Sequence, residues 1–567
     1  MGFLSNITHR KESVTASPQS EVTDPEKHGA DEDNTPVKFL TLRTFFMGVL
    51  VSMGGFIFGY DTGSISGYLL MKDFMRRFAE YNEHTHEYYF TNVRKGVIVG
   101  LLSVGTLIGS LVSAPLADRF GRKWSICGWV VIYCVGVVVQ ISSEHHWYQV
   151  PIGRMVAGFG VGALSVLVPM YQSESAPRHV RGALVSCFQL FVTLGIFVAY
   201  CIDYGTETKD NASSWRIPMG CGYIWACILG FGIILFPESP RYAYRKGDIE
   251  GARRTMARLY GVDIHHREIE AEMKEIKDKL DAERAGGDRP WHEFFTGPAM
   301  MYRTLLGIAL QMFQQLTGAN FFFYYGATIF QATGLNNSYV TQMILGAVNF
   351  GTTFGGLYVV EKFGRRKALI VGGAWMFICL IIFASIGHFA LDLNHPQSTP
   401  KTGSAMIVFA CLFICGYAMT WGPIIWAIIG ELYPSQYRAK CMSIATASNW
   451  LWNFLIAFFT PFITSAIDYR YGYVFAGATF AAICTVFFFV QEGKGKTLEE
   501  IDTMYITGVP AWKSESWVPP PADELVTTDR ISADMGGFST FKKVKESGNA
   551  GTADHTAEAG EGATVEA

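Results

Sequence analysis

Residues 96–117 read GVIVGLLSVGTLIGSLVSAPLA and contain no charged side chain. An α-helix rises about 1.5 Å per residue, so this stretch is long enough to cross the roughly 30 Å hydrocarbon core of a lipid bilayer. The stretch lacks the alternation of polar and apolar residues that a strand of a membrane barrel would need. It therefore predicts a transmembrane helix, and with it a protein that is surrounded largely by lipid.

Eleven further stretches have the same length and character. They lie at 44–66, 124–143, 149–172, 183–203, 217–236, 304–330, 339–360, 368–389, 404–429, 441–466 and 471–490. Half of the 567 residues are hydrophobic and only 17% are charged, whereas a soluble protein carries about a quarter charged residues. The predicted fold class is an all-α membrane protein with twelve transmembrane helices, which excludes a soluble enzyme.

Charge and cysteine content exclude two further classes of function. The net charge of −3 offers no basic excess for a nucleic-acid partner. The 11 cysteines lie in or beside apolar segments and form no CxxC pair, so they read as small hydrophobic residues of helices. We expect no metal site, no cofactor and no catalytic constellation.

The basic residues in the short loops predict the orientation of the chain. With an inner N-terminus, the inner loops hold Arg119, Arg122, Lys123, Arg178, Arg181, Lys362, Arg365, Arg366, Lys367, Arg438 and Lys440. The outer loops then hold Lys209, Arg216, Lys401 and Arg470. The loop between the first two helices disagrees, since it contains five basic residues beside four acidic ones. We expect both termini to be cytoplasmic and the sequons at Asn211 and Asn336 to be outside.

The sequence repeats itself in two places. ESAPRHVR (174–181) and ELYPSQYR (431–438) share the pattern Glu-x-x-Pro-x-x-x-Arg, and ADRFGRK (117–123) matches VEKFGRRK (360–367). Each pair falls at the same place in a set of six helices, so we expect two parallel halves with a substrate site between them near mid-membrane. The expected organisation is a tail (1–37), a first half (38–237), a linker with short helices (238–300), a second half (301–491) and a largely disordered cytoplasmic tail (492–567).

Six short motifs complete the pattern: DRFGRK (118–123), ESAPRHVR (174–181), PESPRY (237–242), QQLTGAN (314–320), EKFGRRK (361–367) and TLEEID (497–502). Together they resemble the sugar porter family of the major facilitator superfamily, and within it the fungal hexose transporters. The resemblance covers about residues 40–505, with QEGKG (491–495) in place of the usual PETKG. It implies uptake of a monosaccharide, glucose or a related hexose, by alternating access across the plasma membrane.

Side-chain amides at membrane depth are the candidate sugar ligands. A bound hydroxyl left unpaired costs roughly 1 to 3 kcal/mol, and an amide offers both donors and an acceptor without a charge. Counting from helix ends puts Gln315, Asn349 and Asn449 about 12 to 16 Å from the nearer surface. The resemblance implies that the sugar contacts Gln189, Gln314, Gln315, Asn320, Asn349, Trp426 and Asn449. Gln311 and Asn453 are further amides at this depth; the alternative is that such amides only join helices.

One acidic and one basic residue stand out inside the apolar stretches. Asp61, in FGYDTGSISG (58–67), is the only charge of 44–66, and Arg154 is the only charge of 149–172. Asp61 lies about 25 Å from the inner end of its helix and Arg154 roughly 8 Å from the outer end of its own, so the two share a depth. We expect an ion pair that couples proton entry to sugar uptake, or a fixed pair that only joins two helices.

Charged residues also recur at the inner ends of helices in both halves. They are Asp118, Arg122, Glu174, Arg181, Glu238, Arg241, Glu361, Arg365, Glu431 and Arg438. The resemblance implies ion pairs that hold the inner side closed, whereas the alternative reads the basic residues as topology signals.

Several functional alternatives stay open at this level. They are proton symport or facilitated diffusion, a transporter or a non-transporting glucose sensor, and the choice among hexoses and pentoses. The oligomeric state also stays open.

Overall fold

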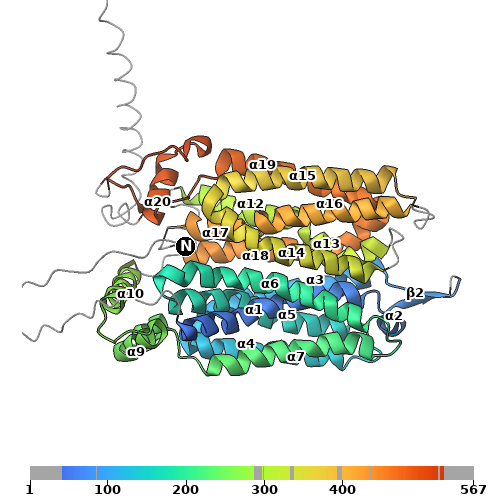
Figure 1. Cartoon of the computed structure of the whole chain (residues 1–567), viewed down its shortest axis with the longest axis horizontal. Coiled ribbons are helices and arrows are strands. Elements are labelled where there is room, and N and C mark those ends of the chain that lie inside the picture. The colour runs from blue at the N-terminus through green and yellow to red at the C-terminus, as the bar shows by residue number, and fades with distance from the viewer. Residues whose placement is uncertain are drawn as a thin grey trace, which may run out of the picture.

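The structure, a computed structural model, describes residues 41–84, 86–286, 297, 299–331, 337–392, 399–434, 437–521 and 524–528. Long, nearly parallel helices make up most of it (Figure 1). The helices of the first half, blue to green, lie beside those of the second half, yellow to red.

Within the described residues, the first half contains six long helices. They are α1 (Leu42–Tyr68), α3 (Asn92–Phe120), α4 (Arg122–Ile141), α5 (Gln149–Ser175), α6 (Arg178–Thr206) and α7 (Ser213–Ile234). Small residues bring α3 and α5 close together, because a β-carbon at Gly158 would lie 3.1 Å from the Cα of Gly105. Such glycine contacts let the backbones of membrane helices approach closely.

The second half contains four unbroken helices and two broken ones. The unbroken helices are α14 (Ser338–Phe363), α15 (Arg365–Phe389), α18 (Arg438–Ile467) and α19 (Tyr471–Phe489), with the short turn η2 (Asp468–Arg470) between the last two. The broken ones are the pairs α12 (Met300–Leu316) with α13 (Ala319–Gln331), and α16 (Pro400–Met419) with α17 (Trp421–Leu432).

The first break corrects the prediction of one continuous helix over 304–330. Gly318 has a φ of +89°, in the left-handed region that favours glycine. A β-carbon there would also lie 2.7 Å from the ring of Phe475. The second break lies at Thr420, with φ −133° and ψ −80°, just before Gly422 and Pro423.

Among the described residues, 10 helical stretches are long and apolar enough to cross a membrane. One of these, Lys440–Phe489, includes both α18 and α19, and the broken helix α12–α13 is not among them. Counting α18, α19 and the broken helix separately recovers the twelve predicted spans.

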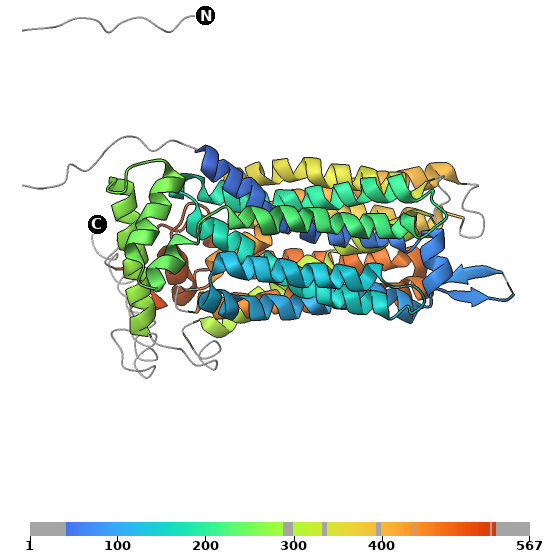
Figure 2. The same cartoon turned by 90° about the horizontal axis from the view of Figure 1, so that it is seen from below.

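Short elements mark the two ends of the bundle. The helices α8 (Pro240–Arg245), α9 (Ile249–Tyr260), α10 (Arg267–Gly286) and α20 (Leu498–Thr507) gather at one end, called here the linker end (Figures 1 and 2). The opposite, hairpin end carries α2 (Lys72–Phe78) and the antiparallel strands β1 (Glu80–Asn82) and β2 (Glu87–Tyr89), paired from Glu80 with Tyr89 to Asn82 with Glu87.

The segment after α19 is folded where a disordered tail was expected. Helix α20 begins with a capping box between Thr497 and Glu500, and the turn η3 (Ala511–Lys513) follows it. Asp502 of α20 pairs with Arg303 of α12 at 2.7 Å, and both side chains are buried. The prediction of a disordered chain therefore does not hold for residues 497–513, and residues 529–567 lie outside the described part.

Described contacts join the halves in the part of the bundle nearer the hairpin end. They are Tyr339 Oη to Gly67 O (3.0 Å), Ala327 N to Ser66 Oγ (3.1 Å), Asn337 Nδ2 to Glu207 Oε1 (2.8 Å), Asn92 Nδ2 to Ser465 Oγ (2.9 Å), and Tyr200 Oη to Phe323 O (3.2 Å). We call this set of contacts the hairpin-end seam.

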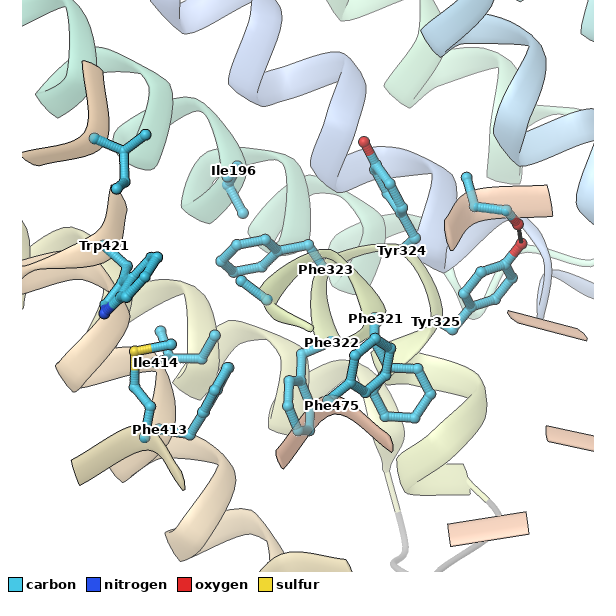
Figure 3. Packing of buried hydrophobic residues seen from close by; sticks show 14 of the residues in the cluster. Ile196, Phe321, Phe322, Phe323, Tyr324, Tyr325, Phe413, Ile414, Trp421 and Phe475 are labelled. Atoms are coloured by element: carbon cyan, nitrogen blue, oxygen red, sulfur yellow. Dashed lines mark hydrogen bonds between the residues drawn. The ribbon is translucent and has the colours of Figure 1, made fainter. Parts of the chain in front are cut away.

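Aromatic side chains of α13 fill the space beside the seam. Figure 3 shows Phe321 and Phe322 turned toward Phe475 and Phe413, while Tyr324 points to the opposite side. Tyr325 Oη donates to the carbonyl of Ala457 at 2.5 Å. The short helix after the break is therefore held firmly within the second half.

Candidate functional site

Asn449 of α18 lies at the centre of a group of buried amides. Its Nδ2 donates to Gln311 Oε1 and to Gln314 Oε1, both at 2.7 Å. Its Oδ1 accepts from Gln315 Nε2 at 2.9 Å. Three glutamines one helical turn or less apart on α12 thus meet a single asparagine of another helix.

The group continues past the break in helix α12–α13. Gln315 Oε1 accepts from Asn320 Nδ2 at 2.6 Å and from Asn453 Nδ2 at 3.4 Å. Asn453 Oδ1 in turn accepts from Tyr324 Oη at 2.9 Å and from Ser103 Oγ of the first half at 2.6 Å. The amide cluster, defined as Gln311, Gln314, Gln315, Asn320, Asn449 and Asn453, therefore reaches the interface between the halves.

The amide cluster also connects the two broken helices. Gln314 Nε2 donates to the carbonyls of Trp421 and Gly422 at 3.0 and 2.9 Å, in the first turn of α17. Trp421 itself is buried, and its Nε1 donates to the carbonyl of Leu369 at 3.0 Å. A ligand that displaced Gln314 would thus act directly on the start of α17.

One polar atom of the amide cluster has no partner among the described residues. Gln311 Nε2 is buried without a hydrogen bond, although Gln311 Oε1 accepts from Asn449. Leaving a buried donor unpaired costs about 1 to 3 kcal/mol. A ligand hydroxyl or carbonyl oxygen placed there would recover that cost, which makes the atom a candidate ligand contact.

The other expected sugar ligands do not join the amide cluster. Asn349 is buried on α14, and Gln189 is half-buried on α6 in the first half. Among the described residues neither side chain has a hydrogen bond to the cluster. Trp426 of α17 has 38% of its surface exposed. Tyr324 and Ser103 do bond to the amide cluster, through Asn453, although they were not among the predicted ligands. Both lie in apolar stretches, where nothing in the sequence distinguishes them from their neighbours.

Asp61 and Arg154 lie side by side, as their matched depths predicted. Nη1 of Arg154 is 3.7 Å from Oδ1 of Asp61, and the side chains are 0% and 9% exposed. Asp61 Oδ2 and the three Arg154 side-chain nitrogens have no hydrogen-bond partner within the described part of the chain. The ion pair is therefore deeply buried but loosely made, without the hydrogen bonds that would fix its geometry.

Arg122 organises the charges at the linker end of the first half. Its Nε is 3.0 Å from Glu174 Oε2, and its Nη1 is 3.0 Å from Asp118 Oδ1. Glu238 accepts from the backbone N–H groups of Arg122 and Lys123 at 2.9 and 3.1 Å. These contacts connect α3, α4 and α5 to the start of the linker.

Arg181 and Arg241 occupy different places from Arg122. Arg181 Nη2 is 3.0 Å from Glu272 Oε1 of α10, so it connects α6 to the linker helices. Arg241 lies in α8. The expected charges of the first half therefore fall into more than one group.

A matching arrangement lies at the linker end of the second half. Arg365 Nη2 is 2.8 Å from Glu431 Oε1, and Arg438 Nε donates to the carbonyl of Tyr433 at 3.2 Å. Glu492 accepts from the backbone N–H groups of Arg365 and Arg366 at 2.9 and 3.0 Å. Glu492 repeats the contacts of Glu238, yet the sequence analysis did not select it. The side chain of Glu361 lies outside the described part.

Comparisons with known proteins give a consistent result. A family model described as sugar (and other) transporter matches residues 47–505. The high-affinity fructose transporter ght6 of Schizosaccharomyces pombe is 46% identical over 479 residues, which cover 84% of this chain and 89% of that protein. The low-affinity glucose transporter of Kluyveromyces lactis is 46% identical over 476 residues, covering 83% and 84% of the two chains.

Solved structures resemble the fold as well. The xylose transporter XylE from E. coli in a partially occluded inward open conformation gives a TM-score of 0.66 at 24% identity, covering 81% of this chain and 100% of that one. The proton:xylose symporter XylE bound to 6-bromo-6-deoxy-D-glucose gives 0.66 at 26% identity, covering 82% and 99%.

Proposed function

The chain belongs to the sugar transporter family of the major facilitator superfamily, and from that premise we propose that it carries a monosaccharide, glucose or a related hexose such as fructose, across the plasma membrane. The observation that carries this proposal is the amide cluster at the interface between the halves. Its donors and acceptors bear no charge, which suits a neutral ligand with several hydroxyls.

The hydrogen bonds of the amide cluster suggest how sugar would enter. Asn449 uses both its donor and its acceptor capacity on three glutamines of α12. Sugar hydroxyls would replace some of these bonds and satisfy the orphan Nε2 of Gln311. Gln189 and Asn349 would contribute from α6 and α14 after the halves shift, and Trp426 would offer its ring face to the sugar.

Alternating access would use the halves as two blocks. The hairpin-end seam closes one side, and the Arg122 and Arg365 networks hold together the helix ends within each half. The loop charges favour a cytoplasmic linker end with both termini inside, so this arrangement corresponds to one that is closed on the outside. We retain the proposal that the charged helix ends, with Glu361 among them, close the linker end when the seam opens.

Proton symport through Asp61 and Arg154 completes the proposal. The pair is buried and loosely made, so adding a proton to Asp61 breaks only one long contact. A protonated Asp61 would free Arg154 and let the helices α1 and α5 shift relative to each other. Facilitated diffusion is the alternative, in which the pair stays fixed and no proton moves.

Uptake of labelled glucose into proteoliposomes tests both parts. With an inward proton gradient we expect the wild type to accumulate sugar above equilibrium, and Asp61→Asn to lose accumulation while still exchanging sugar. Equilibration without accumulation in the wild type would establish facilitated diffusion. An absence of flux for glucose, fructose and xylose would contradict transport and favour a sensor.

A further inference from the structure

A carboxylate that this scheme does not use lies near the hairpin end of α6. Asp203 is 1% exposed, and neither of its carboxylate oxygens has a hydrogen-bond partner among the described residues. Gly67 of α1 packs directly against it, because a β-carbon at Gly67 would lie 2.7 Å from Asp203 Cγ. An ionised carboxylate buried without a partner is very costly, so the group needs a proton in this arrangement.

Three of the four tyrosine hydroxyls near Asp203 are engaged elsewhere. Four tyrosines lie within electrostatic reach, namely Tyr60 and Tyr68 on α1, Tyr200 on α6 and Tyr339 on α14. Three of the hydroxyls donate to backbone carbonyls: Tyr60 to Pro218 at 2.6 Å, Tyr200 to Phe323 at 3.2 Å and Tyr339 to Gly67 at 3.0 Å. No hydroxyl among these three is therefore available to stabilise a negative charge on Asp203.

The charged groups of the region do not compensate Asp203 either. Arg154 on α5 faces Asp61 of α1, and Glu207 on α6 accepts from Asn337. Cys221 on α7 lies near Tyr60 and is uncharged as a thiol. Within the described part, no lysine or arginine forms an ion pair with Asp203.

Contacts of the hairpin-end seam cover this carboxylate. Gly67, which packs on Asp203, accepts the hydroxyl of Tyr339 from the second half. The neighbouring Ser66 accepts Ala327 N at 3.1 Å, also from the second half. Separation of α13 and α14 from α1 and α6 would remove these contacts and let water reach Asp203 from the hairpin end.

We propose that Asp203 is a proton-binding group that controls the hairpin-end seam: it carries a proton while the seam is closed and ionises when the seam opens. The proton comes from outside water, forms one O–H bond on the carboxylate, and returns to the same water on opening. No proton crosses the membrane by this route, so the group acts on the opening step and not on proton coupling. The opening of the seam and the assignment of the hairpin end to the outside rest on the proposed function.

The sign of the effect follows from linkage. The closed seam binds one more proton than the open seam, so acid outside favours closure and alkali favours opening. One linked proton changes the ratio of open to closed transporter by up to about tenfold per pH unit.

A thiol placed in the seam measures this ratio without any sugar. Thr328 of α13 contacts Lys95 Nζ of α3 at 3.4 Å across the seam. In intact cells, a membrane-impermeant maleimide would label Thr328→Cys, which is partly buried in the closed seam, faster when the seam opens. Labelling of the chain's own cysteines is measured in the parent chain without Thr328→Cys and subtracted. The rate at which the maleimide reacts with glutathione at each pH corrects for the pH dependence of the reagent.

After this correction we expect labelling to rise with outside pH in the Asp61→Asn background, where Asp61 no longer titrates. Adding Asp203→Asn should remove the pH dependence and keep labelling at its low, acid value. Asp210→Asn is the matched control, since Asp210 lies at the same end, is 72% exposed and pairs with Lys72. It should leave the profile unchanged.

Two results would overturn the proposal. One is that the corrected labelling of Thr328→Cys in the Asp61→Asn background, with Asp203 intact, does not change with pH. This result does not require an Asp203 variant to fold. The other is an Asp203→Asn profile equal to that of its parent. Because labelling needs no sugar, failure of sugar flux would contradict the proposed function and leave this result standing.

Discussion

In the second half, six amide side chains bond to one another and leave one donor unpaired, whereas in the first half Asp61, Arg154 and Asp203 are buried with few partners. The amides exchange one neutral partner for another at little cost, which suits reversible binding of a polar, uncharged ligand. The charges are stable only in particular protonation states, which suits a response to protons. From this difference we propose that sugar contact falls mainly in the second half and the proton response in the first.

The largest expected effect concerns the charges of the first half. Arg154→Leu leaves the buried Asp61 carboxylate without its cation, which should lower the free energy of unfolding by about 3 to 5 kcal/mol. Adding Asp61→Asn should recover most of this loss, because the uncompensated charge is gone. Thermal unfolding of the purified single and double variants in detergent measures both effects. Equal losses in Arg154→Leu and in the double variant would show that the arginine acts by packing alone.

A smaller effect is expected for the centre of the amide cluster. Asn449→Leu removes the partner of three glutamines. Each buried polar group left unpaired in the sugar complex should weaken the free energy of sugar binding by about 1 to 3 kcal/mol. For one such group, half-saturation of glucose uptake should therefore rise by about 5- to 150-fold.

The matched control for that variant is Gln149→Ala. Gln149 bonds to Val139 O and Ser142 Oγ at the hairpin-end start of α5, away from the amide cluster. It should leave half-saturation unchanged. If Asn449→Leu also left half-saturation unchanged, the sugar would contact mainly the first half. The contrast drawn between the two halves would then be wrong.

The smallest effect concerns the one place where the halves look alike. Glu238→Gln and Glu492→Gln each weaken charge-assisted bonds to backbone N–H groups and should each cost about 1 kcal/mol of stability. Unfolding temperatures of the two variants should fall by similar amounts. Glu515→Gln, which breaks an exposed pair with Lys367, should have little effect. A loss confined to one half would show that the two linker-end networks are not equivalent.

Much of this arrangement follows from the sequence because the membrane restricts the choices. Apolar length predicted the helices, and counting residues from their ends placed Asp61 and Arg154 at one depth. The same counting predicted that Gln315 and Asn449 share a level, and the structure joins them at 2.9 Å. Counting residues from a helix end therefore predicts how far along the membrane normal a side chain lies.

Other features depend on the angle around the helix, which depth does not give. Asn349 shares the level of Asn449 but bonds to no member of the amide cluster among the described residues. Asp203 lies at the very end of its apolar stretch, where a carboxylate is normally solvated, so its burial by Gly67 and Tyr339 depends on packing alone. Gly318 gave a signal for the break in helix α12–α13, but one glycine in a long apolar stretch is weak evidence.

The ion pair between Arg303 and Asp502 has a consequence for how the chain is made. Arg303 lies at the start of the second half, and its partner helix leaves the ribosome 199 residues later. Asp502 is then held by the N–H and hydroxyl of Thr528, at 2.6 and 2.9 Å. Until translation passes these positions, a buried guanidinium lacks its counter-charge, so the second half completes its folding only after synthesis has moved well past the last transmembrane helix. Chains released before Asp502 would expose this unpaired arginine to the quality-control machinery of the membrane in which they are inserted.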